Sequence, residues 1–504
     1  MKNKILCNIT ASLVLEIVTV ICSFILPRMI ISGFGSEYNG ITSSVTQFLS
    51  VVTLLRSGIG GVTRAALYKP LMENDVYKIS GIIKSTEQFM RKIVYIFSVF
   101  LLLFAASYPL LVSEDFSWFY TFTLILILGI TTISQYYFGI TYQFLLIADQ
   151  KTYIYNILQT IATILNTVFS VILINIGVEF RLMKLVSAIV FAAIPIVLYW
   201  YVHKKYTILK DVPKDDSCIR QRWDAFVHQI ASFIHTNTDL MLLTIFTNLY
   251  QVSVYNVYFM VVYGVRRFVT VFTSGVEASI GKLIASKDKQ LDNFISVYEF
   301  GMNIISTIVF VSTAILIIPF MKVYMMDVTD VNYIRPALGY WLVFASFLAC
   351  IRLPYQNIVE SAGHFKETRK GAITEAALNI VLSLVLIHSF GAVGVAVGTA
   401  FAMAFRTIQY ALYSYKHIME RSYLILLKRM ITTCVNIAVI MIPYFLLNLD
   451  DVLKNNTDNY FTWITESFLI FMIIAFVSIL INAISYHKHF FAAISLITKS
   501  KKHK

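Results

Sequence analysis

Long apolar segments alternate along the chain with short segments in which charged residues gather. Each apolar segment has about 20 residues, the length that an α-helix needs to cross the roughly 30 Å hydrocarbon core of a bilayer. The pattern predicts an all-α polytopic membrane protein with about 14 transmembrane helices. Their expected ranges are 5–32, 38–61, 93–113, 119–148, 152–176, 185–202, 225–247, 253–281, 296–320, 336–360, 371–390, 392–415, 430–448 and 461–485.

The positions of the basic residues predict the orientation. An even number of helices places both termini on the same side of the membrane. With that side taken as cytoplasmic, 30 of the 41 Lys and Arg residues fall in cytoplasmic segments, five fall in outer segments and six lie within spans. The positive-inside rule therefore predicts a multi-pass protein of the inner (plasma) membrane with both termini in the cytoplasm.

Composition excludes several classes of protein. Apolar residues make up 58% of the chain and charged residues 14%, which excludes a soluble multidomain protein. The net charge of +13 lies mainly in the connections between helices, so we expect the bilayer and no nucleic acid as a partner. No nucleotide-binding GxxxxGK[ST] motif and no metal-ligand spacing occur, so we expect no enzyme activity, no ATP site, no metal and no cofactor, with a coupling cation or proton as the energy source.

Two parts of the chain resemble each other. A shift of 213 residues aligns Leu165–Ile174 with Leu378–Ile387, and six of the ten positions are identical. This match maps helices 1–6 onto helices 7–12 and predicts two parallel six-helix lobes related by a pseudo-two-fold axis, an arrangement typical of alternating-access transporters. The alternative is coincidence between helices rich in Leu and Ile. The expected parts are an N-lobe (1–202), a cytoplasmic linker (203–224), a C-lobe (225–415), and helices 13–14 with a basic C-terminal tail (416–504).

Polar residues form stripes on three of the predicted helices. The stripe on helix 1 includes Asn8, Ser12 and Glu16, and the stripe on helix 7 runs from His228 to Asp239. Because these residues recur every three or four positions, each stripe occupies one helix face. Such faces avoid lipid tails, which predicts a polar bundle interior or a wet cavity. The structural alternative is packing between helices through Ser and Thr.

Six basic residues lie inside the predicted spans, and all are arginines. They are Arg28, Arg56, Arg266, Arg267, Arg352 and Arg406. Each would cost about 2.5–3.5 kcal/mol at the lipid-facing centre of a helix, so we expect the set to face the protein interior. The planar guanidinium matches phosphate oxygens in pairs, which predicts a phosphate-bearing substrate. Adjacent Arg266 and Arg267 point about 100° apart, so at most one of them faces a cavity squarely.

The alternative for each arginine is an ion pair within the helix bundle. The candidate partners in the sequence are Glu16, Asp239, Glu277 and Glu360.

Several segments resemble bacterial polysaccharide flippases, the O-antigen and capsule repeat-unit translocases of the multidrug/oligosaccharidyl-lipid/polysaccharide exporter superfamily. The most specific is SAGHFKETRKGAITEAALNIVLSLVLIHSFGAVGVAVGTAFAMAFRT (361–407), and NTDLMLLTIFTNLYQVSVYNVYF (237–259) adds support. Leu26-Pro27-Arg28 and Arg56-Ser57-Gly58-Ile59-Gly60 look similar to the family as well.

The resemblance implies a flippase that moves an oligosaccharide linked to undecaprenyl pyrophosphate across the inner membrane by alternating access, for surface polysaccharide biosynthesis. The six arginines become candidates for binding the headgroup, and Glu16 or Asp239 for an ion or proton site that couples transport to a gradient. A glycan polymerase and other assembly proteins are the implied partners. Three alternatives stay open: a multidrug cation antiporter of the same superfamily, a lipid II flippase, and a non-transporting scaffold.

Overall fold

The computed structural model of the chain is built from helices, with no strand among the residues that it describes. Those residues are 2–56, 59–112, 116–209, 211–213, 237–273, 276–286, 291–449 and 459–486, together with Phe233, Leu453 and Thr457. The chain divides into two compact units, Met1–Val254 and Tyr255–Lys504.

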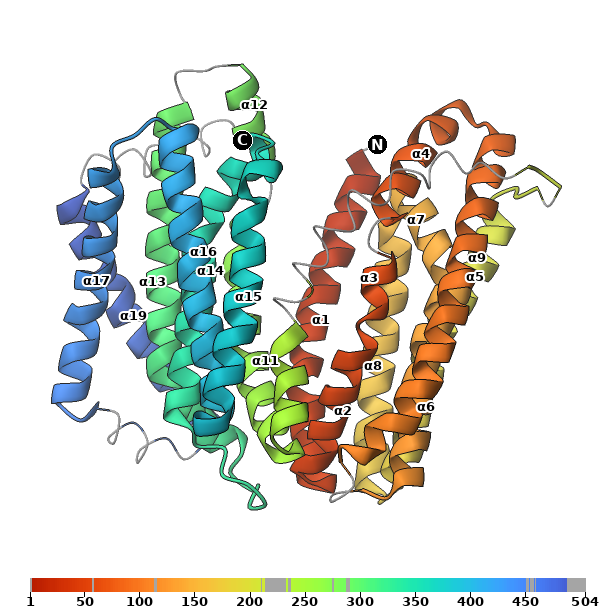
Figure 1. The fold of residues 1–504 in the computed structure, drawn as a ribbon, viewed down its shortest axis with the longest axis horizontal. Coiled ribbons are helices and arrows are strands. Elements are labelled where there is room, and N and C mark those ends of the chain that lie inside the picture. Colours follow the sequence, from red (N-terminus) through yellow and green to blue (C-terminus); the bar gives the residue numbers. More distant parts are fainter. Residues whose placement is uncertain are drawn as a thin grey trace. The chain divides into compact units, whose positions relative to one another are not determined.

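The first unit contains the helices α1 to α9, which Figure 1 labels, together with the 3₁₀ turn η1 and the π-helical turn η2. Their bounds are α1 (Lys2–Phe34), α2 (Ser36–Leu49), α3 (Val52–Arg56), α4 (Ile59–Glu73), α5 (Val76–Ser107), η1 (Tyr108–Leu110), α6 (Trp118–Ser134), η2 (Gln135–Gly139), α7 (Ile140–Ala148), α8 (Thr152–Asn175) and α9 (Phe180–Lys205). A shorter apolar helix, Asn237–Phe246, follows in the same unit.

The second unit begins within α11, and its described residues form seven further helices. Their bounds are α11 (Leu249–Val271), α12 (Val276–Ala285), α13 (Leu291–Tyr324), α14 (Pro336–Ser361), α15 (Phe365–Phe390), α16 (Ala392–His417), α17 (Tyr423–Leu446) and α19 (Tyr460–Ser485). Within this unit α16 packs against both α14 and α15, and α13 packs against α14 and α19.

The prediction of an all-α polytopic membrane protein is confirmed. Among the described residues, eleven helices are long and apolar enough to cross a bilayer, or twelve when the bent pair Ser36–Leu54 and Ile59–Glu73 counts as one span. In the expected span 225–247, residues 225–232 and 234–236 lie outside the described residues, and the rest includes the helix Asn237–Phe246. The expected span 253–281 corresponds to α11 and α12, and adjacent Arg266 and Arg267 make α11 less apolar than its neighbours.

The segment 62–92, between the second and third expected spans, is helical apart from Asn74 and Asp75. It consists of the end of α4 and the first half of α5, which continues unbroken to Ser107. Asp75 caps α5 by accepting a hydrogen bond from the Lys78 backbone N–H at 3.0 Å, and this bond lowers the pKa of the Asp75 carboxyl. The cap explains why the third membrane helix begins well before its apolar part does.

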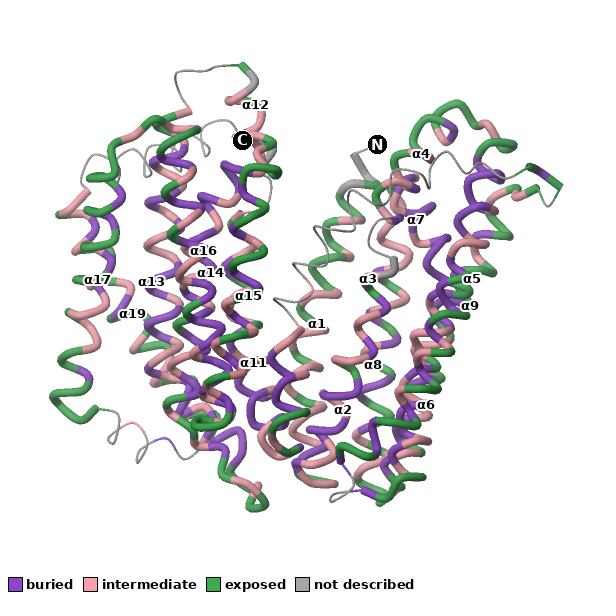
Figure 2. The backbone as a smooth tube through the Cα atoms, in the orientation of Figure 1, coloured by how far each residue is buried: buried purple, intermediate pink, exposed green. Residues whose placement is uncertain are grey.

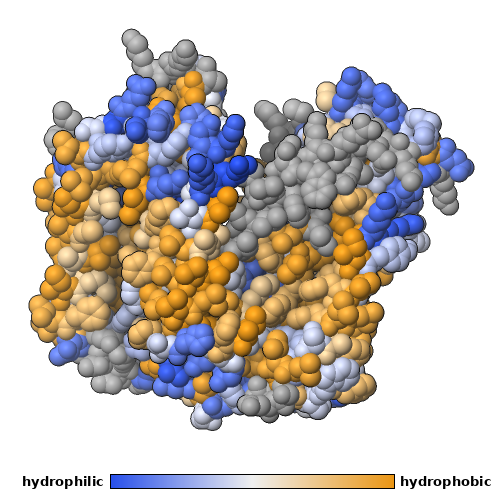
Figure 3. Space-filling model, in the orientation of Figure 1, coloured by the Kyte–Doolittle hydropathy of each residue, from blue (hydrophilic) through white to orange (hydrophobic). Residues whose placement is uncertain are grey.

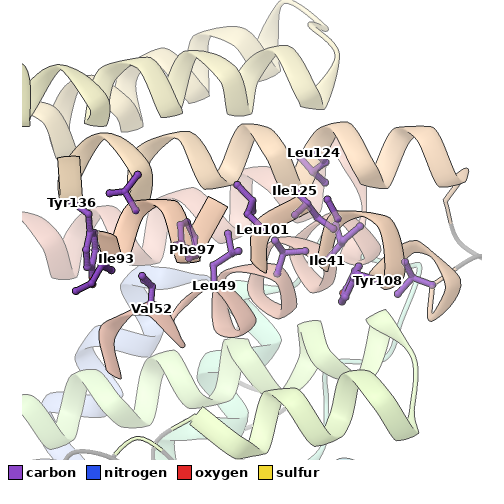
Figure 4. Close-up of a cluster of buried hydrophobic side chains, with 14 of the residues drawn as sticks. Ile41, Leu49, Val52, Ile93, Phe97, Leu101, Tyr108, Leu124, Ile125 and Tyr136 are labelled. Carbon is purple, nitrogen blue, oxygen red and sulfur yellow. The ribbon is translucent and has the colours of Figure 1, made fainter. Parts of the chain in front are cut away.

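Apolar side chains from α2, α3, α5 and α6 contribute to a buried hydrophobic cluster of the first unit (Figure 4). Leu124 and Ile125 on α6 and Ile41 on α2 are fully buried, and Phe97 and Leu101 face them from α5. Figure 2 shows the buried residues along the inward faces of the helices in each unit. The helices therefore pack by interdigitation of apolar side chains inside each unit.

The sides of the helices are also apolar where they face outward. Figure 3 shows hydrophobic side chains over the flanks of each unit and hydrophilic ones gathered near the helix ends. On α19, for example, Phe461 and Phe476 are 75% and 70% exposed. An outward face of this kind is stable in lipid and would be a liability in water.

Small residues allow α15 and α16 to approach closely. A Cβ added to Gly394 would lie 2.4 Å from the Leu386 carbonyl oxygen, and one added to Gly398 would lie 2.6 Å from Ser383 Oγ. Both distances are shorter than van der Waals contact, so no larger residue fits at these positions without a shift of the helices.

We expect Gly394→Ala to destabilise the protein by about 1–3 kcal/mol, because the added methyl group overpacks the contact between α15 and α16. Gly301→Ala on α13 is the matched control, since a Cβ there meets no atom within 4 Å. The midpoint of thermal unfolding in detergent is the measurement. Equal midpoints for the two variants would contradict the close approach of α15 and α16.

Candidate functional site

Two arginines on neighbouring helices share one glutamate inside the second unit. Arg352 Nη1 on α14 lies 2.7 Å from Glu375 Oε1 on α15, and Arg406 Nε on α16 lies 3.4 Å from Glu375 Oε2. All three residues are buried, at 8%, 7% and 4% exposure for Arg352, Glu375 and Arg406. The network joins three helices within a membrane-spanning region.

Arg406 makes the larger number of contacts. Its Nη1 donates to the Thr368 carbonyl oxygen at 2.9 Å and to Gln409 Oε1, and its Nη2 donates to the Tyr410 hydroxyl at 2.8 Å. The guanidinium carbon also lies 4.0 Å from the centroid of the Tyr410 ring, within the range of a cation–π interaction. These contacts fix the orientation of the Arg406 guanidinium.

Positive charge exceeds negative charge in this region of the second unit. Among the described residues, Arg352 and Arg406 share the single carboxylate of Glu375. Arg266 on α11 lies within electrostatic range of Arg352 and Glu375 and adds a third guanidinium group. The buried Nε of Arg352 has no hydrogen-bond partner in the described part of the chain. An excess of this kind favours an anion, because a further negative charge would complete the neutralisation.

Arg267 differs from its neighbour Arg266. It is exposed, and its guanidinium lies 5.8 Å from the centroid of the Tyr263 ring. Arg266 is only partly exposed. The two side chains leave the helix in different directions, as the 100° step between adjacent residues requires. The structure therefore groups Arg266, and not Arg267, with Arg352 and Arg406.

The other two predicted arginines belong to the first unit. Arg28 follows Pro27 on α1 and is partly buried. Arg56 is the last residue of α3, and its side chain lies outside the described part of the structure. The network around Glu375 forms without either residue.

The polar stripe on α1 is used in part for packing against α8. Asn8 donates to the Gln150 carbonyl oxygen at 3.0 Å and accepts from the Tyr153 N–H at 2.9 Å, while Ser12 accepts from Asn156 at 2.9 Å. Glu16, one turn further along, is partly buried. Asn8 and Ser12 therefore serve packing between helices, which was the alternative to a polar cavity for this stripe.

Asp239 lies in the short helix Asn237–Phe246 and is 8% exposed. The preceding stripe residues His228, Ser232 and His235 lie outside the described residues. No group of three or more His, Cys, Asp or Glu side chains that could hold a metal ion occurs among the residues with described positions.

Glu375 was not among the expected ion-pair partners of the arginines. Those were Glu16, Asp239, Glu277 and Glu360, whereas Arg352 and Arg406 pair with a carboxylate on α15. A signal was present, because Glu375 is an acidic residue within the predicted span 371–390, between two spans that each carry an arginine.

A second ionic cluster was also missed. Glu299 on α13 is 3% exposed, and its Oε2 lies 2.6 Å from Arg429 Nη1 and 3.1 Å from Arg421 Nη1. Burial alone would lower the pKa of Arg421, but its hydrogen bond to Asp292 and the charge of Glu299 raise it. Both arginines had been placed in a cytoplasmic connection, so their contact with a buried carboxylate was not expected.

Comparisons with known proteins give a fold and no family. No family model matches the chain, and no curated protein matches it. Among solved structures, the chain is similar to the lipid II flippase MurJ in its inward closed conformation, with a TM-score of 0.69, 16% identity and coverage of 95% of this chain and 99% of that one.

Two multidrug transporters are similar as well. One is a MATE family transporter of the MOP superfamily in an inward-facing conformation, with a TM-score of 0.61, 12% identity and coverage of 80% of this chain and 95% of that one. The other is the MATE multidrug transporter DinF-BH, with a TM-score of 0.56, 15% identity and coverage of 82% of this chain and 95% of that one. At these identities the likeness shows a common fold.

We expect Glu375→Ala to lower the free energy of unfolding by about 3–5 kcal/mol, because the change leaves Arg352 and Arg406 buried without their shared carboxylate. Glu367→Ala, at an exposed position in the first turn of the same helix, should cost less than about 1 kcal/mol. Thermal unfolding of the purified variants in detergent measures both. A Glu375→Ala variant as stable as Glu367→Ala would show that the ion pairs carry no stability.

Proposed function

We propose that the protein is a flippase that moves an oligosaccharide linked to undecaprenyl pyrophosphate across the inner membrane for surface polysaccharide biosynthesis. The observation that carries this proposal is the excess of buried guanidinium charge around Glu375. A pyrophosphate supplies the negative charge that this region lacks, and its oxygens suit the paired donors of arginine. The sugars and the polyprenyl carrier come from the resemblance to polysaccharide flippases.

In the proposed cycle, the protein alternates between inward-open and outward-open states. Arg266, Arg352 and Arg406 attract the pyrophosphate, while the polyprenyl tail stays in lipid. When the headgroup leaves, the positive charge near the substrate path must be neutralised again, and Glu375, which pairs with Arg352 and Arg406, provides part of that neutralisation. A cation or proton bound at Asp239 or Glu16 would couple the cycle to a gradient. Both termini face the cytoplasm, and a glycan polymerase uses the exported lipid.

Two other functions are favoured by the fold. The similarity to MurJ covers nearly the full length of both chains, so lipid II is a second candidate substrate. A cation antiporter of the MATE type is a third. An organic cation would meet repulsion from Arg266, Arg352 and Arg406, whereas lipid II carries the same pyrophosphate as the first candidate.

A deletion strain separates these functions. Loss of surface polysaccharide with accumulation of its lipid-linked precursor, in viable cells, is the result expected of a polysaccharide flippase. Loss of viability with accumulation of lipid II would indicate the peptidoglycan precursor instead. Drug sensitivity with normal glycan and normal precursor levels would indicate the antiporter and contradict the proposal.

Arg266 allows a sharper test of the headgroup site, because none of its contacts is an ion pair within the described residues. We expect Arg266→Ala to reduce export roughly ten- to a hundredfold, since a charge-assisted hydrogen bond contributes about 1.5–3 kcal/mol. Arg267→Ala changes the adjacent exposed residue and should leave export within about twofold. The measurement is surface glycan per cell at equal protein level in the membrane. Equal export by the two variants would remove Arg266 from the site.

A further inference from the structure

A partly open cavity of about 120 Å³ lies in the first unit, among α6, η2, α7, α8 and α9. Three glutamines from three elements line it: Gln135 on η2, Gln143 on α7 and Gln159 on α8. Tyr155 and Phe191 add aromatic rings to its wall. All the residues that line the cavity are described, and none of them is charged.

The three glutamine side chains have no hydrogen-bond partner within the described part of the chain. Each amide offers two N–H donors and a carbonyl acceptor, so the cavity wall presents six donors and three acceptors without protein partners. In a membrane region, polar groups left unpaired cost free energy, because no lipid can replace the missing hydrogen bonds. Such a wall is stable only when water or a polar ligand fills the cavity.

The backbone around the cavity departs from regular helix at two points. The π-helical turn Gln135–Gly139 interrupts the membrane helix that begins at Trp118, and turns of this kind are frequent at functional sites. Pro195 on α9 has no N–H to donate, so the Phe191 carbonyl lacks its usual helical partner at the cavity wall.

Close packing holds these two irregularities together. A Cβ added to Gly139 would lie 2.5 Å from Pro195 Cβ, so only glycine allows η2 to approach α9 this closely. Ser134 Oγ donates to the Ala192 carbonyl oxygen at 3.1 Å and ties the two helices at the same level.

The second unit has no equivalent of this cavity wall at the aligned positions. The 213-residue shift pairs Gln143 with Gln356, which donates to Glu360 at 2.7 Å. It pairs Gln135 with Leu348 and Gln159 with Ala372, and neither replacement has a polar side chain. The glutamine set is therefore a feature of the first unit and is not required by the shared helical fold.

The chemistry of the wall selects among ligands. A cation would find no carboxylate in it, and an anion would find no basic group. A purely apolar group would leave the amides unpaired. A neutral ring with hydroxyl groups at its edge and C–H groups on its faces fits best, since amides bind hydroxyl groups both as donors and as acceptors while the aromatic rings cover the apolar faces.

We propose that this cavity binds one uncharged sugar residue of the transported oligosaccharide. The inference rests on the proposed function, because it assigns the glycan and not the pyrophosphate to the first unit. Gln135, Gln143 and Gln159 pair with the sugar hydroxyls, and Tyr155 and Phe191 lie against the ring.

The test compares two lipids bound to the full-length protein in nanodiscs, by native mass spectrometry. One is the lipid-linked oligosaccharide extracted from the deletion strain, and the other is undecaprenyl pyrophosphate without sugar. Gln143→Leu/Gln159→Leu keeps the side-chain volume and removes two amides, so its affinity for the oligosaccharide lipid should fall about tenfold while that for the bare carrier is unchanged. Gln251→Leu removes an amide from α11, outside the cavity, and should change neither affinity.

Each other outcome overturns the assignment in a distinct way. Wild-type affinity of the double variant for both lipids means that the cavity holds water only. A loss of affinity for both lipids means that the glutamines support the fold and not the sugar. Wild-type protein that binds neither lipid removes the proposed function together with the sugar site. Gln159→Leu alone, measured in the same way, replaces the double variant if the latter does not purify as a single species.

Discussion

Hydrocarbon cannot hydrogen-bond, and this constraint decides where every polar side chain of a membrane-spanning chain can lie. In the second unit it forces two arginines into contact with one glutamate across three helices. In the first unit it requires that water or a ligand fill the space in front of three glutamines. The two compact units meet the same constraint in different ways, through ion pairs in one and an uncharged polar cavity in the other.

This difference suggests a division of recognition between the units. A lipid-linked oligosaccharide has a charged part, the pyrophosphate, and an uncharged part, the sugars. The arginines around Glu375 offer charge-assisted hydrogen bonds in a fixed geometry, which suits an invariant headgroup. Glutamine amides can serve as donors or acceptors, so they adapt to the hydroxyl pattern of a sugar. The same fold could serve different glycans if the residues that line the cavity of the first unit change while the arginine network of the second unit remains.

The membrane helices were predictable because their signal is local. Runs of about 20 apolar residues predicted α8 and α16 within a few residues of their bounds. The start of α5 was not predictable from hydropathy, since its first half is polar and is defined by the Asp75 cap. Helix that extends beyond the bilayer leaves no apolar signal.

The site was predictable only as a set of candidates. The six basic residues within the predicted spans are all arginines, which indicated that they face the protein interior. The structure places two of them, Arg352 and Arg406, in one buried network. Their partner Glu375 was missed because pairing between helices depends on rotation about each helix axis, which a periodic pattern leaves open. The glutamine cavity gave no signal at all, since Gln135, Gln143 and Gln159 are brought together by a π-helical turn and by the contact of Gly139 with Pro195.

The most direct test of the central claim is a flipping assay in proteoliposomes. Purified protein is reconstituted with the lipid-linked oligosaccharide from the deletion strain, and a glycosidase added outside reports the fraction of oligosaccharide exposed on the outer leaflet. The account predicts that this fraction rises toward completion in vesicles with wild-type protein and stays near one half in protein-free vesicles. A fraction near one half in both would contradict the assignment of this protein as a flippase of lipid-linked oligosaccharide.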